Sequence, residues 1–140
     1  MNTGGLKFRI ILNAFTASDW RGFAIFVQTS FMISWNDFEK VEIRTGTILK
    51  AEDFPEARKP AWKLTIDFGE LGVLNSSAQI TSLYKREDLP GKQVVAVVNF
   101  PPKQIGPFRS QCLVLGAYTA NGDVVLLQPE RKVENGRRIG

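Results

Sequence analysis

Short runs of alternating apolar and polar residues, each the length of a β-strand, constrain the fold of this chain more than any other feature. In the first run, 41–54, the residues expected to share one face are Val41, Ile43, Thr45, Thr47, Leu49 and Ala51. The expected strands are 41–54, 61–70, 72–78, 92–100, 112–119 and 123–129. Asn121 and Gly122 separate the last two strands and predict a tight hairpin.

One helical segment interrupts the strands. Ile80, Leu83 and Tyr84 recur at helical spacing within 79–89, and a Pro-Gly pair ends the pattern. Three strands, a short helix and three more strands are typical of the oligonucleotide/oligosaccharide-binding (OB) fold. The sequence therefore predicts an all-β fold, a five-stranded OB-fold barrel with a short helix between strands 3 and 4 and small C-terminal strand additions. A β-sandwich is the main alternative.

Two local signals lie near the first strand. Gly46 interrupts the run and indicates a bend or bulge, which curving a strand around a small barrel requires. Asp37 precedes a short helical pattern, 37–41, and is expected to be its N-cap.

The N-terminal part of the chain differs from the rest. Its densest apolar stretch, 22–33, is too short to span a bilayer. Lys7 and Arg9 precede only a brief apolar patch, which makes a poor signal peptide. We expect residues 1–31 to be an N-terminal extension, 32–140 to be the main domain, and no membrane insertion. An extra strand or helix packed on the domain is the alternative.

The composition argues against catalysis. The chain has no histidine, which excludes Ser/His/Asp and Cys/His nucleophiles and the usual zinc sites. Its single cysteine, Cys112, lies in an apolar run and is expected to be a buried small hydrophobe. One cysteine forms no intrachain disulfide, which suits a reducing cytoplasm. The net charge of +4 permits a polyanionic partner without requiring one. We expect no enzymatic activity, metal or cofactor.

Several long stretches resemble a known family. They read FEKVEIRTGTILKAEDFPEARKPAWKLTIDFGE, NSSAQITSLY, VVAVVNFPPKQIGPFRSQCLVLGA and GDVVLLQPERKVENGRRIG, within residues 36–140. These stretches resemble the CsaA family of small export-related chaperones. More widely, they resemble the tRNA-binding OB module at the C-terminus of many methionyl-tRNA synthetases. Cys112 and Leu113 stand where the tRNA-binding relatives usually carry Gly-Met, and this difference favours CsaA.

The resemblance implies a cytoplasmic homodimer of OB folds. CsaA proteins are described as binding unfolded or precursor polypeptides and assisting their export, which makes the export translocase an expected partner. The related modules bind tRNA by shape rather than by sequence. Polypeptide and tRNA are therefore both candidate ligands.

Basic and polar residues in and near two loops, with Lys85 at the end of the expected helix, define a candidate RNA site. In OB folds, the loops after the first and fourth strands rim the binding face, so their cations are expected to converge on phosphates. The candidates are Lys50, Arg58, Lys59, Lys85, Asn99, Lys103, Arg109 and Ser110. Alternatively, each cation only solubilises its own loop.

A candidate peptide site overlaps the same loops. The segment 99–117 carries three prolines, which hold an apolar loop open with little entropy left to lose on binding. The candidates are Phe54, Asn75, Ser76, Ser77, Gln79, Phe100, Pro101, Pro102, Ile105 and Phe108. Alternatively, the apolar residues of 100–108 bury one another at a dimer interface.

Overall fold

The computed structural model describes residues 31–140, and the chain divides into two compact units, 1–40 and 41–140. The proposed extension, 1–31, lies almost wholly outside the described residues and stays a prediction. In the first unit, helix α3 spans Trp35–Glu39. Its N-cap is Ser34, whose Oγ accepts a hydrogen bond from Asp37 N at 3.1 Å, while Asp37 Oδ2 accepts one from Ser34 N at 3.0 Å. The predicted cap at Asp37 was wrong, because Asp37 completes a capping box that begins three residues earlier.

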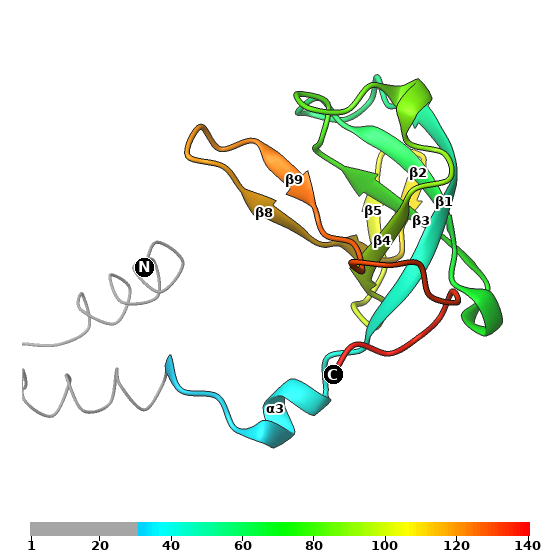
Figure 1. The fold of residues 1–140 in the computed structure, drawn as a ribbon. Helices are drawn as coiled ribbons and strands as arrows, with labels where there is room; N and C mark the ends of the chain where they lie inside the picture. The colour runs from blue at the N-terminus through cyan, green and yellow to red at the C-terminus, as the bar shows by residue number, and fades with distance from the viewer. Residues whose placement is uncertain (1–30) are drawn as a thin grey trace, which may run out of the picture. The chain divides into compact units, whose positions relative to one another are not determined.

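The second unit is a five-stranded antiparallel barrel sheet with two hairpins (Figure 1). The sheet strands are β1 (Ile43–Asp53), β2 (Trp62–Asp67), β3 (Val73–Ala78), β4 (Gln93–Val97) and β7 (Leu113–Val114). Their order in the sheet is β3-β2-β1-β4-β7. The hairpins are β5 (Lys103–Ile105) with β6 (Phe108–Ser110), and β8 (Gly116–Tyr118) with β9 (Val124–Leu126). The predicted all-β OB fold is confirmed.

The long strand β1 joins both sides of the barrel. Its first half pairs with β4 and its second half with β2, and a bulge shifts the register between Ile48 and Lys50. Gly46 is required for packing, since a Cβ there would lie 2.7 Å from the Phe68 ring. The predicted bulge therefore lies just after Gly46, and the glycine lets the Phe68 ring approach the backbone.

The inward face of β1 differs from the prediction. Ile48, which was outside the predicted set, joins the core. Of the predicted set, Ala51 packs against the core and Leu49 is exposed. The core residues are Ile48, Leu64, Ile66, Phe68, Ala78, Ile80, Leu89, Val94, Ala96 and Cys112. Alternation alone could not assign the faces because Thr45 is also buried, through hydrogen bonds to the C-terminal tail.

The C-terminal tail, 133–139, covers the part of β1 that extends past β2 (Figure 1). Three backbone bonds join them: Thr45 N to Arg137 O, Gly136 N to Thr45 O and Ile139 N to Ile43 O, at 3.0, 2.7 and 2.9 Å. Thr45 Oγ1 also donates to Glu134 O at 2.8 Å, and Thr47 Oγ1 to Asn135 Oδ1 at 2.7 Å. The tail thus acts as a further strand that protects an open sheet edge.

The barrel closes between β3 and the residues after β6 with the help of side chains. Gln111 N donates to Asn75 O at 2.8 Å, and Gln111 Oε1 accepts from Asn75 N at 3.0 Å. The hydroxyl of Ser76 donates to Cys112 O at 2.9 Å. Closure through side chains leaves the outer edge of β3 without a regular ladder.

The helix between strands β3 and β4 is shorter than predicted. A three-residue 3₁₀-helix, Arg86–Asp88, replaces the helix expected at 79–89. Trp62 Nε1 donates to Tyr84 O at 3.0 Å, and Asp88 N bonds to Lys85 O instead of continuing an α-helix. Ile80 and Leu89 still lie in the core. Their burial explains why apolar residues recur in 79–89 although the segment is not a regular helix.

Candidate ligand-binding rim of the barrel

The proline-rich segment forms the hairpin β5–β6 rather than an open loop. Gly106 and Pro107 make its turn, with Gly106 at φ 57°. The hairpin packs on the barrel through Phe108, whose ring contacts the Phe54 ring at a centroid distance of 5.2 Å. Lys63 Nζ lies 5.8 Å and 5.9 Å from the two ring centroids. This aromatic contact holds the hairpin at the barrel rim.

A cationic cavity of about 510 Å³ lies between the first loop and the hairpin. Its lining residues are Glu56, Ala57, Arg58, Lys59, Ala61, Ser77, Gln79, Lys103, Gln104, Ile105 and Gly106. It brings together three of the cations predicted for RNA, Arg58 and Lys59 from the first loop and Lys103 from the hairpin. Arg109, Lys50 and Lys85 do not line it. The two loops therefore meet at one place on the rim.

An apolar cavity of about 370 Å³ lies at the base of the hairpin. Its lining residues are Phe100, Pro101, Lys103, Ser110, Gln111, Cys112 and Leu113. Phe100 is 54% exposed and Leu113 48% exposed, so both apolar side chains remain open to a ligand. Cys112 is buried, and burial raises the pKa of its thiol to about 12, which makes it an inert wall of the cavity.

The predicted peptide-binding residues separate into structural and accessible ones. Phe54 is only 5% exposed, and Ser76 is buried in the barrel closure. Asn75 also bonds to Gln111, and Ser77 N donates to Ser110 Oγ at 3.2 Å. Of the remaining candidates, Gln79, Pro101 and Pro102 are exposed, and Ile105 and Phe108 are half-buried.

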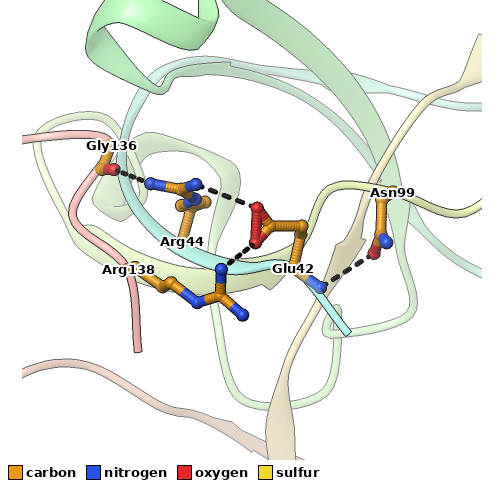
Figure 2. A network of polar contacts seen from close by, with 5 residues as sticks. All are labelled: Glu42, Arg44, Asn99, Gly136 and Arg138. Atoms are coloured by element: carbon orange, nitrogen blue, oxygen red, sulfur yellow. Dashed lines mark hydrogen bonds and ion pairs between the residues drawn. The ribbon is translucent and has the colours of Figure 1, made fainter. Parts of the chain in front are cut away.

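Asn99, predicted to bind RNA, supports the start of β1 (Figure 2). Its Oδ1 accepts a hydrogen bond from Glu42 N at 2.9 Å. The Glu42 carboxylate lies between two arginines, at 2.9 Å from Arg44 Nη2 and 3.0 Å from Arg138 Nη1. Arg44 Nη1 also donates to Gly136 O at 3.0 Å. This network fixes the tail to β1 and lies outside the residues that line the two cavities.

The network predicts an acid-sensitive attachment of the tail. The hydrogen bond from Arg44, with the charges of Arg138 and Arg44, holds the pKa of Glu42 below its ordinary value of 4.5. A depressed carboxyl pKa contributes stability that is present above the unfolded pKa and lost as pH falls through the folded one. We expect Glu42→Gln to flatten the loss of stability below pH 4.5, measured by urea unfolding across acidic pH. If the free energy of unfolding of Glu42→Gln falls with pH as steeply as that of the wild type, the Glu42 carboxylate does not stabilise the attachment of the tail.

The sequence patterns did not single out three residues that contribute to the site or to barrel closure: Gln104, Gln111 and Leu113. Gln111 closes the barrel, Leu113 lines the apolar cavity, and Gln104 lines the cationic cavity. The alternation of Lys103, Gln104 and Ile105 is a weak strand signal that the surrounding prolines obscured. Within residues 31–140, no cluster of three or more His, Cys, Asp or Glu could hold a metal ion. No helix in that range is long and apolar enough to cross a membrane.

Comparisons with known proteins place the chain in a family. Residues 43–138 match the family described as "Putative tRNA binding domain". Crystal structures of the CsaA chaperones of Bacillus anthracis str. Ames and Picrophilus torridus are each 55% identical to the chain, at TM-scores of 0.74 and 0.73. Each match covers 78% of this chain, and 99% and 100% of those chains.

A curated relative, the methionine–tRNA ligase of Methanococcoides burtonii, is 34% identical over 108 residues. The match covers 77% of this chain but only 16% of the ligase, so the chain spans a small part of that relative's length. The chain therefore belongs to the tRNA-binding domain family and is a CsaA-like OB-fold member of it.

Proposed function

We propose that this chain is a CsaA-like chaperone of the cytoplasm that binds unfolded or precursor polypeptides as a homodimer and assists their export through a translocase. The observation that carries the proposal is the 55% identity over nearly the full length of two CsaA chaperones. Its action is binding, without catalysis.

The apolar cavity supports polypeptide as the ligand. Phe100 and Leu113 present exposed apolar surface beside the exposed prolines of the hairpin. Because Pro101 and Pro102 restrict the backbone, this surface has little conformational entropy left to lose when a client binds. Apolar burial is not directional, so exposed apolar surface in this cavity suits clients of many sequences.

Exposed apolar side chains on the β8–β9 hairpin support the homodimer. This hairpin extends away from the barrel in Figure 1. Tyr118 is 81% exposed and Val125 42%, and Leu127, which directly follows β9, is 43% exposed. A second copy covering these side chains would remove apolar surface from water, which is favourable at about 25 cal/mol per Å².

Client protection is the first test. We expect the full chain to suppress light scattering when a guanidinium-unfolded client is diluted into buffer. Phe100→Ser is expected to raise the amount of chain needed about fivefold, because it removes exposed apolar area from the cavity. Leu71→Ser is the matched control, since Leu71 is 44% exposed and lines neither cavity. Equal protection by both variants would exclude the apolar cavity as the client site.

Binding of tRNA is a second candidate function, favoured by the cationic cavity. The cations Arg58, Lys59 and Lys103 converge there from two loops. Phosphates neutralised by such cations release counterions, so binding weakens steeply with salt.

Changing all three cations to alanine is expected to lower the slope of log affinity for tRNA against log salt by about 2 to 3. The measurement is a filter-binding or fluorescence titration at several salt concentrations. Lys50→Ala is the control, because Lys50 pairs with Glu52 at 3.5 Å and lies outside the cavity. If the triple variant keeps the wild-type slope, these residues do not contact tRNA.

A further inference from the structure

The hairpin β5–β6 leaves one strand edge unpaired. β5 pairs with β6 on one side, and no other strand within residues 31–140 pairs with its opposite side. The two strands form three pairs of facing residues, and the middle pair is Gln104 with Arg109. In a hairpin with a two-residue turn, the pair beside the turn exchanges both backbone bonds and the next pair directs its N–H and C=O outward. The main-chain N–H and C=O of Gln104 therefore face the open side of β5.

The cationic cavity borders this open edge. Four consecutive residues, 103–106, line the cavity, whereas no residue of β6 does. Across the cavity lie Ser77 and Gln79, at the end of β3. Ser110 and Gln111 already cover the outer side of β3, so β5 supplies the strand edge beside the cavity. The cavity thus lies along β5, whose unpaired edge is the kind of edge to which an extended chain adds as a further strand.

The charge of the cavity indicates what kind of strand it fits. Arg58, Lys59 and Lys103 oppose a single carboxylate, Glu56, in the lining. An extended chain with acidic side chains complements this charge. The lining residues include no aromatic side chain on which a nucleic-acid base could stack. A strand edge also offers main-chain groups at the spacing of another polypeptide backbone, which RNA does not match.

We infer that the cationic cavity binds an extended acidic polypeptide segment, which adds to β5 through the main-chain N–H and C=O of Gln104. The inference rests on the proposed polypeptide-binding function and adds a recognition mode and a class of client sequence to it. Backbone pairing makes the interaction tolerant of sequence, while the three cations select for glutamate and aspartate.

A proline substitution isolates the backbone contact. Gln104→Pro removes the outward N–H but no hydrogen bond between β5 and β6, because proline is tolerated at an outward edge position. Gln104→Ala is the matched control, since it loses the same side chain, whose Nε2 donates to Gly106 O at 2.9 Å, and keeps the N–H. The probe is a fluorescein-labelled decapeptide of alternating glutamate and valine, titrated into the full chain.

We expect Gln104→Pro to bind the peptide about tenfold more weakly than Gln104→Ala, with the alanine variant close to wild type. The peptide is also expected to slow hydrogen exchange of the Gln104 amide in the wild-type chain, a readout that does not depend on the folding of any variant. Equal affinity of the two variants, or an unprotected Gln104 amide in the saturated complex, would overturn the inference. An Arg58→Ala variant that loses tRNA affinity while keeping peptide affinity would also overturn it.

The same variants separate this inference from the proposed function. If the wild type protects a client while Gln104→Pro and Gln104→Ala bind the peptide equally, the chaperone function stands and the strand-addition site is wrong. If the wild type protects no client but still binds the peptide through Gln104, the site stands and the chaperone function is wrong.

Discussion

Replacing Phe68 by alanine is expected to lower the free energy of unfolding by about 3–5 kcal/mol. Phe68 is fully buried, with 0% exposure, and is the largest of the fully buried side chains within residues 31–140. Its ring lies where a Cβ at Gly46 would fall, and Gly46 has no side chain to fill the space that alanine leaves. The measurement is chemical unfolding of the full chain followed by circular dichroism.

Phe100→Ala is the matched control for this prediction. It makes the same chemical change at a side chain that is 54% exposed, so its effect on stability is expected to stay within about 0.5 kcal/mol. The two variants distinguish an effect on stability from an effect on ligand binding, since Phe100 lines the apolar cavity and Phe68 does not. A similar loss of stability in both variants would contradict the assigned core.

Deleting residues 133–140 is expected to cost about 2–4 kcal/mol and to promote aggregation. The deletion removes three backbone hydrogen bonds to β1 and the partners of the Thr45 and Thr47 hydroxyls. It also exposes the edge of β1 beyond the end of β2, where another chain could pair. Urea unfolding and light scattering on standing measure the two effects.

Arg131→Ala is the control for the deletion. Arg131 lies just before the deleted residues, its side chain is 83% exposed, and its ion pair with Glu130 is a surface pair of little expected value. A truncated chain that unfolds at the same urea concentration as this variant would show that the tail does not stabilise the barrel.

The sequence predicted those parts of the fold that depend on local signals. Asn121 and Gly122 predicted the β8–β9 hairpin, where Gly122 adopts a φ of 87°. Cys112 is buried as its apolar surroundings indicated. The inward face of β1 was partly wrong because the bulge between Ile48 and Lys50 breaks the alternation. The tail that buries Thr45 lies some ninety residues later, and no local pattern shows that contact. The helix at 79–89 was too long because Trp62 binds the carbonyl of Tyr84.

The candidate site was less predictable than the fold. The order of the strands predicted that cations of the two rim loops would lie close together. Arg58, Lys59 and Lys103 do line one cavity. The sequence could not show that Asn75 and Ser76 close the barrel, since their partners Gln111 and Cys112 lie some 36 residues away. Polar residues with long-range structural partners look the same in a sequence as polar residues that bind a ligand.

Client protection measured across a salt titration tests whether the chain is a polypeptide-binding chaperone. The full chain is mixed with an unfolding client, light scattering is followed at low and at moderate salt, and tRNA affinity is measured in the same buffers. We expect strong suppression of scattering at a near-stoichiometric amount of dimer, and we expect it to change little with salt, because salt does not screen apolar burial. Unchanged client scattering, together with tRNA binding that falls steeply with salt, would contradict it.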